Sequence, residues 1–156
     1  MLTRRTLLGT LTASAAAFSQ PKAVEPGDPW TAKDLMSPAD LAALVEKKSG
    51  VPVFYVGFPA LYKQAHIPTA KMTGPCRQQS GLDLLKAELA SMPKNKEFVL
   101  YCGCCPWDHC PNVRPAWKMV KEMGFTKAKL VTIPTNLHTD WSSKGYPTVR
   151  AQAPSE

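Results

Sequence analysis

Four of the five cysteines in this 156-residue chain lie between positions 102 and 110, in the segment CGCCPWDHCP. A cysteine thiolate is a strong nucleophile and a soft metal ligand. The segment can therefore transfer sulfur, exchange disulfides or bind a soft metal ion. Because the number of cysteines is odd, at least one thiol stays outside any intramolecular disulfide. We take the segment from Cys102 to Pro111 as the first candidate for chemistry.

Three interpretations remain open for Cys104, Cys105 and Cys110. As resolving thiols, they accept sulfur from Cys102 or close a disulfide with it. As a structural pair, they form a disulfide of their own, for which the loop length favours Cys105 with Cys110. As metal ligands, they join His109 around zinc, copper or an iron–sulfur centre. The spacing C-x-C-C-x4-C matches no standard metal site.

The composition excludes several classes of protein. Hydrophobic residues make up 44% of the chain and charged residues 20%, which is usual for a folded soluble protein, and the length fits one domain. No apolar run reaches the ~20 residues that a membrane-spanning helix needs, so we expect no stable membrane span. The net charge is +7, but the basic residues form no block, so we expect no nucleic-acid partner.

The first twenty residues, MLTRRTLLGTLTASAAAFSQ, have the order of an export signal. Arg4 and Arg5 form a basic start, a short apolar stretch follows, and small residues up to Ser19 suit cleavage. The arginine pair resembles a twin-arginine signal. We therefore expect residues 1–19 to be cleaved after export through the twin-arginine machinery to the periplasm. We expect the Pro- and Gly-rich residues 20–30 to form a linker.

The cysteine segment directly follows residues 97–101, an apolar run that predicts a buried strand. Strands are also predicted at 51–56 and 130–133. Helices are predicted from Ser37 to Gly50, at 82–92, and from Asn112, as a cap, to Gly124. Strands that alternate with helices indicate an α/β fold with a parallel sheet. In such sheets ligands bind beyond the carboxyl ends of the strands, where the cysteine segment begins.

Residues 31–149 resemble a rhodanese-like domain, the fold of a family of sulfurtransferases. The resemblance rests on three stretches in the family's order: residues 53–70, which include HIPTA; residues 99–102, a strand that ends on a cysteine; and Trp141 with Gly145–Pro147. It implies a three-layer α/β/α sandwich around a parallel sheet, with residues 150–156 as a tail. The resemblance also implies that Cys102 takes sulfane sulfur from a donor such as thiosulfate and holds it as a persulfide. The sulfur then passes to a thiol or another acceptor.

The resemblance implies no required cofactor, and a metal ion on the cysteine segment stays an open alternative. A thiol at the end of a parallel strand faces loop N–H groups and the N-terminus of the next helix, which lower its pKa. The same N–H groups suit a small sulfur-containing anion. We therefore expect the substrate to contact Gly103, Cys104, Cys105, Trp107 and Arg114, and Arg114 to add a positive charge.

The cysteine loop is longer than the resemblance leads us to expect. Aligning Met123–Phe125 with the end of the family's helix would place the nucleophile near position 107 instead of at Cys102. A longer loop costs little closure entropy, but its N–H groups stay loose unless something holds them. We therefore predict that one pair among Cys104, Cys105 and Cys110 is bonded or bridged, which leaves Cys102 free.

Overall fold

The computed structural model describes residues 24–150; the predicted export signal and the first part of the predicted linker lie outside the described residues. The strands are β1 Leu35–Met36, β2 Val53–Tyr55, β3 Ala65–His66, β4 Ala70–Met72, β5 Phe98–Tyr101, β6 Ala128–Val131 and β7 Val149–Arg150. The α-helices are α1 Pro38–Glu46, α2 Pro59–Gln64, α3 Gln79–Leu89, α4 Val113–Glu122 and α5 Leu137–Asp140. Short 3-10 helices are η1 Ala32–Asp34, η2 Trp107–His109 and η3 Ser142–Lys144. None of the helices between residues 24 and 150 is long and apolar enough to cross a membrane.

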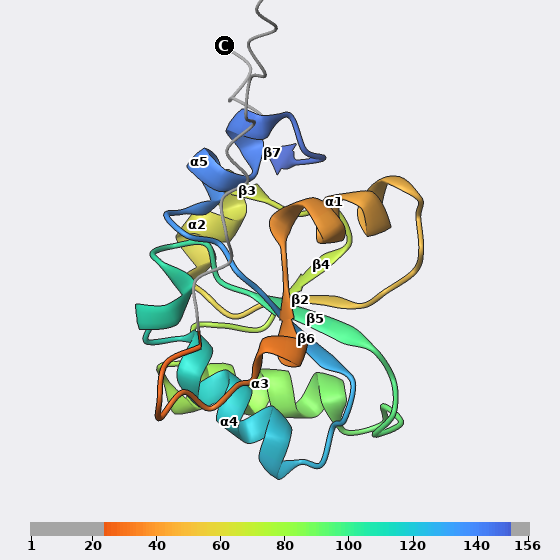
Figure 1. Cartoon of the computed structure of the whole chain (residues 1–156), viewed down its shortest axis with the longest axis vertical. Helices are drawn as coiled ribbons and strands as arrows, with labels where there is room; N and C mark the ends of the chain where they lie inside the picture. The colour runs from red at the N-terminus through yellow and green to blue at the C-terminus, as the bar shows by residue number, and fades with distance from the viewer. Residues whose placement is uncertain (1–23, 151–156) are drawn as a thin grey trace, which may run out of the picture.

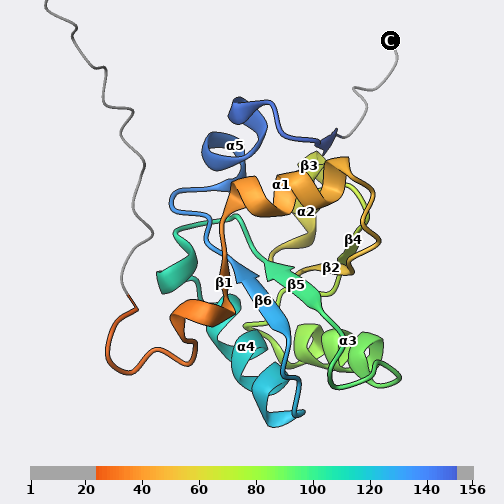
Figure 2. The same cartoon turned by 45° about the vertical axis from the view of Figure 1, so that its right-hand side comes forward.

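The centre of the molecule is a five-stranded sheet in the order β1-β6-β5-β2-β4, and all its pairs are parallel. Helices α3 and α4 cover one face of this sheet, and α1, α2 and α5 lie on the other side (Figures 1 and 2). The short strands β3 and β7 form a separate antiparallel pair. The prediction of an α/β sandwich around a parallel sheet is confirmed.

Strand β5 shows how the sequence builds the two halves of the core. Phe98 and Leu100 belong to the cluster that contains the buried residues of α3 and α4, whereas Val99 and Tyr101 belong to the cluster beneath α1 and α5. All four side chains are fully buried. This is the alternation expected of a strand that is covered on both faces. Since the alternation continues past Tyr101, Cys102 points toward the α3 and α4 side.

The predicted start of α1 is confirmed, but the predicted cap of α4 is wrong. At α1 the Ser37 hydroxyl accepts a hydrogen bond from the Asp40 N–H at 3.1 Å, and Pro38 occupies the first turn. Asn112 precedes α4 but already has helical backbone angles, and its side chain caps nothing. Its amide is instead buried in the cysteine loop.

Residues 24–30, the described part of the predicted linker, pack against the domain. Trp30 is 2% exposed. The Trp117 indole N–H donates to the Pro29 carbonyl at 3.0 Å, and Arg114 forms an ion pair with Asp28 at 2.6 Å. Burial of an indole and an anchored carboxylate explain why this Pro-rich stretch is ordered. This part of the predicted linker is therefore integral to the folded domain.

Candidate active site: a thiol cluster at the end of β5

The cysteine loop starts where the central strand stops. Strand β5 ends at Tyr101, and Cys102 is the next residue. Gly103 then has φ +77°, a conformation that residues with a side chain rarely adopt. Its carbonyl accepts a hydrogen bond from the Leu137 N–H at 2.9 Å, and a Cβ at position 103 would come within 2.9 Å of Leu137 Cβ. Glycine at 103 therefore lets the chain turn closely beside the first residue of α5.

Backbone contacts hold the extended loop. Besides the bond to Gly103, the Trp107 N–H donates to the Ile133 carbonyl at 3.1 Å, so both contacts come from the chain after β6. The Trp107 ring is 5% exposed and lies 5.0 Å from the ring of Trp30. All five cysteines are free thiols in this structure. The predicted bond or bridge within one pair among Cys104, Cys105 and Cys110 therefore stays a prediction. In this structure, the two backbone hydrogen bonds and the burial of Trp107 hold the loop.

The four thiols of the loop are gathered in one cluster. Cys104 lies at its centre, with its Sγ 3.0 Å from Cys102 Sγ, 3.2 Å from Cys105 Sγ and 3.8 Å from Cys110 Sγ. The sulfurs of Cys102, Cys104 and Cys110 all lie within 4.8 Å of one another. Cys102 and Cys110 are buried, while Cys104 and Cys105 are half-buried. We call the four sulfurs of Cys102, Cys104, Cys105 and Cys110 the thiol cluster.

The thiols differ in how readily they ionise. Hydrogen bonds with Cys104 and Cys110, together with burial, raise the pKa of Cys102. The pKa of Cys110 is lowered, because the Cys102 and Cys104 thiols and the backbone N–H groups of Asn112 and Val113 surround its sulfur. The expected lowering of the Cys102 pKa is therefore wrong. The N-terminal N–H groups of α4 face Cys110 instead.

A pocket of about 430 Å³ opens on the start of the cluster. It is lined by Tyr55, Leu61, Gln64, Ala65, Cys102, Gly103, Cys104, Asn136, Leu137, His138, Ser142 and Arg150. Of the loop thiols only Cys102 and Cys104 are among these residues. Two groups that carry or can carry positive charge, Arg150 and His138, line the same pocket. Cys102 and Cys104 are thus the loop thiols that face this pocket.

The structure places several predicted site residues elsewhere. Gly103 and Cys104 line the pocket as expected, but Cys105, Trp107 and Arg114 do not. The Arg114 guanidinium donates to the Asp108 carbonyl at 2.9 and 3.1 Å and pairs with Asp28. It therefore fastens the N-terminal segment to the loop instead of facing the thiol.

His109, a candidate metal ligand under one of the open interpretations, is also away from the cluster. Its side chain is 78% exposed, and Nδ1 lies 3.1 Å from a carboxylate oxygen of Asp108. No imidazole nitrogen joins the grouped sulfurs in the part of the chain that the structure describes. The grouped sulfurs instead include Cys102, which the sequence assigned to catalysis.

Two residues that the sequence analysis missed reach the site from other parts of the chain. Asn112 is fully buried; its Oδ1 accepts from the Arg77 N–H at 3.1 Å, and its Nδ2 lies 3.8 Å from Cys102 Sγ as a donor. Arg150 belongs to β7, which pairs with β3, although position 150 was assigned to the tail. From the sequence, Asn112 was predicted to cap a helix and position 150 to begin the C-terminal tail. Neither residue was therefore predicted to contact the site.

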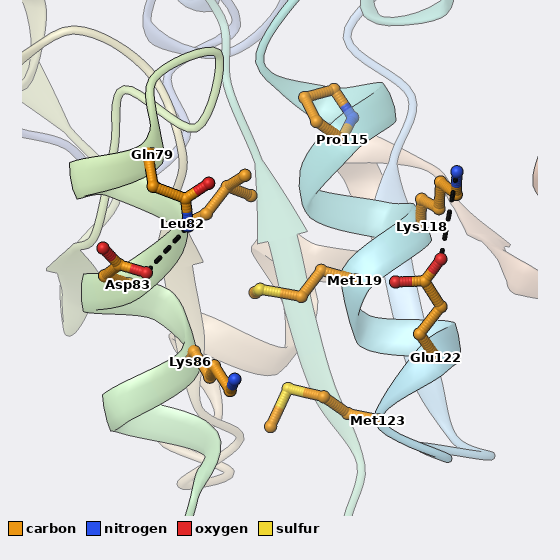
Figure 3. A pocket seen from close by; sticks show the side chains of 9 residues that line it. All are labelled: Gln79, Leu82, Asp83, Lys86, Pro115, Lys118, Met119, Glu122 and Met123. Atoms are coloured by element: carbon orange, nitrogen blue, oxygen red, sulfur yellow. Dashed lines mark hydrogen bonds and ion pairs between the residues drawn. The ribbon is translucent and has the colours of Figure 1, made fainter.

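A second hollow lies between α3 and α4, away from the thiols (Figure 3). It is lined by Gln79, Leu82, Asp83, Lys86, Pro115, Lys118, Met119, Glu122 and Met123. None of these side chains carries a thiol or an imidazole. The pocket at the end of β5, unlike this hollow, is lined by thiols.

The fold and the site define a class of protein: an α/β sandwich that presents a thiol beyond the carboxyl end of a central parallel strand. The sequence profile of the rhodanese-like domain matches residues 37–132, more than half of the chain. The chain therefore belongs to the rhodanese-like domain family. No curated protein matches it.

Solved structures agree with this fold. The crystal structure of the BH2092 protein from Bacillus halodurans is 21% identical, with a TM-score of 0.58 over 76% of this chain and 78% of that one. The solution structure of the rhodanese-like domain of the Anabaena Alr3790 protein is 16% identical, with a TM-score of 0.56 over 79% and 86%. Protein hp1203 from Helicobacter pylori is 17% identical, with a TM-score of 0.54 over 78% and 96%.

Proposed function

We propose that this protein is a sulfurtransferase that carries sulfane sulfur on Cys102 as a persulfide. One observation carries the proposal: Cys102 directly follows the central strand β5 and lines the pocket, whereas the fully buried Cys110 does not line it. Ligands of open parallel sheets bind beyond the carboxyl ends of the strands. A donor in the pocket would therefore meet the Cys102 sulfur before any thiol deeper in the loop.

The proposed reaction has two displacements. In the first, Cys102 passes its proton to the neighbouring Cys110 thiolate, and the Cys102 thiolate attacks the outer sulfur of thiosulfate; the new S–S bond forms, the old one breaks, and sulfite leaves with the bonding electron pair. In the second, an acceptor nucleophile attacks the outer sulfur of the persulfide, and Cys102 leaves as a thiolate. Charge and sulfur balance at each step, and no external oxidant or reductant is needed.

The walls of the pocket suit an anionic donor. Arg150 and His138 line the pocket together with the amide groups of Gln64 and Asn136. A cation near the entrance attracts a dianion such as thiosulfate and slows the approach of cationic molecules. Arg150 thus takes the role that the sequence analysis gave to Arg114.

Turnover tests the proposal. With thiosulfate as donor and cyanide as acceptor, the wild-type chain should form thiocyanate, and Cys102→Ser should abolish this activity because a hydroxyl is a far weaker nucleophile at neutral pH. Cys105→Ser is the matched control, since Cys105 belongs to the same loop but does not line the pocket. Full thiocyanate formation by Cys102→Ser would contradict the proposal. Loss of this activity in Cys105→Ser but not in Cys102→Ser would contradict it as well.

We also propose that the protein works in the periplasm after twin-arginine export and signal cleavage. The support is the sequence of residues 1–19, which lie outside the described part of the chain. The export pathway carries folded proteins, so the loop and its thiols would be in place before transport.

A further inference from the structure

The thiol cluster has the composition of a soft-metal site. Cys102, Cys104 and Cys110 each offer one sulfur, and these three atoms lie within 4.8 Å of one another. Among residues 24–150, no carboxylate oxygen or imidazole nitrogen joins this group. Sulfur-only donor sets favour soft cations over hard ones. Sulfur transfer needs only the Cys102 thiol to carry sulfur, so it does not explain why three sulfurs lie together here.

We propose that Cys102, Cys104 and Cys110 bind one Cu(I) ion in a three-coordinate site. This assignment does not depend on the proposed sulfur transfer, because it needs only the three sulfurs and their spacing. It differs from the candidate set that the sequence left open, which contained Cys105 and His109 and did not contain Cys102.

The number of donors favours Cu(I) over zinc. Structural zinc sites in proteins are almost always tetrahedral, with four protein ligands. Here the fourth thiol, Cys105, touches Cys104 at 3.2 Å but lies outside the mutually close group. Cu(I) is stable with two or three thiolates, so the group as it stands is complete for Cu(I) and one ligand short for zinc.

The spacing needs only a small adjustment. A three-coordinate ion with metal–sulfur bonds of ~2.3 Å holds its sulfurs ~4 Å apart. Cys104 Sγ and Cys110 Sγ are already 3.8 Å apart, while Cys102 Sγ and Cys104 Sγ, at 3.0 Å, must separate further. Rotation of the half-buried Cys104 side chain can provide this separation. The turn at Gly103 keeps both of these thiols on the same side of the loop.

The surroundings favour an occupied site. Cys110 is fully buried, and Cys102 is 3% exposed, so a bound ion would be shielded from water and oxidants on most sides. Three thiolates around Cu(I) carry a net negative charge, which the Asn112 side-chain amide beside Cys102 and the N-terminus of α4 partly offset. The pocket that opens on Cys102 and Cys104 gives the ion an entry path.

Copper binding and sulfur transfer would exclude each other. Both use the Cys102 sulfur, and a sulfur bonded to copper cannot attack a donor. The Cu(I) form should therefore resist alkylation of Cys102 by iodoacetamide, and removal of the ion with a Cu(I) chelator should restore the reaction.

An anaerobic competition titration tests the site. The fully reduced chain is titrated with Cu(I) in the presence of the chromophoric Cu(I) chelator bicinchoninate. We expect one equivalent of Cu(I) to be withdrawn from the chelator, with affinity reduced at least about 10-fold in Cys110→Ser and within about twofold of wild type in Cys105→Ser. Equal losses in the two variants would contradict the three-sulfur set, and no withdrawal of Cu(I) by the wild type would overturn the site.

Two measurements on the wild type avoid any effect of substitution on folding. X-ray absorption of the Cu(I) form should show three sulfur neighbours at about 2.3 Å; nitrogen or oxygen neighbours would contradict the assignment. In a mixture of equal amounts of Cu(I) and Zn(II), copper should fill the site. Recovery of the protein with zinc instead would show that the cluster is a zinc site and would refute the choice of ion.

Discussion

Asn112 makes the most informative target for substitution, because its side chain joins two parts of the site. Asn112→Ala removes the acceptor of the half-buried Arg77 N–H, whose hydrogen bond is 3.1 Å long. Loss of such a hydrogen bond costs about 0.5–1.5 kcal/mol, so we expect the free energy of unfolding to fall by about 1 kcal/mol. The substitution also removes the donor that lies 3.8 Å from Cys102 Sγ.

Loss of the Asn112 amide donor should slow the alkylation of Cys102. A long N–H···S contact contributes at the lower end of hydrogen-bond energies, about 0.7 kcal/mol, and this corresponds to about a threefold smaller thiolate fraction. Urea unfolding measures the first effect, and the rate of iodoacetamide modification of the Cys102 peptide measures the second. Asn95→Ala, at an exposed position, is the control. Unchanged stability and an unchanged modification rate in Asn112→Ala would refute the role given to this amide.

Three further predictions concern charge. Arg4→Lys with Arg5→Lys should abolish export, because the twin-arginine pathway reads the arginine pair itself; undiminished mature protein in the periplasm would contradict the signal. Arg150→Gln should raise the KM for thiosulfate about threefold at low salt without changing kcat, and an equal effect at high salt would exclude an electrostatic role. Burial raises the pKa of Asp34, but hydrogen bonds from Thr31 and the positive charges of Lys121 and Lys33 outweigh it, so the pKa lies below 3.8. Asp34→Asn should therefore cost about 1 kcal/mol above pH 5, and this difference should shrink as the pH falls below 3.8; a difference independent of pH would refute it.

The fold follows from local patterns that a sequence displays directly. The runs at 53–56 and 98–101 are apolar on both faces, and only strands inside a covered sheet need that pattern. The start of α1 combines a capping serine with a proline in the first turn, which fixes one end of the helix. Cys102 could be placed at the site because it directly follows such a strand. In a parallel sheet the carboxyl ends of all strands lie at the same edge, and ligands bind there.

The rest of the site depends on contacts between distant segments. Arg114 stands in the first turn of α4, but nothing in its local sequence shows that its guanidinium turns toward Asp28, 86 positions away. Arg150 reaches the pocket through the pairing of two-residue strands, β3 with β7, which have no sequence signature. The grouping of three sulfurs could not be predicted from the cysteine spacing, which matches no standard metal motif. The grouping depends instead on how the loop turns at Gly103.

If Cys102 carries the transferred sulfur, peptide mass spectrometry of the native chain should find it there. The reduced chain is incubated with thiosulfate, alkylated without a reductant and digested. We expect a mass gain of about 32 Da, one sulfur atom, on Cys102, and fragment ions can locate it because Cys102 and Cys104 are separated by Gly103. A persulfide confined to Cys104, Cys105 or Cys110, or none at all while the chain still converts thiosulfate and cyanide to thiocyanate, would contradict the account.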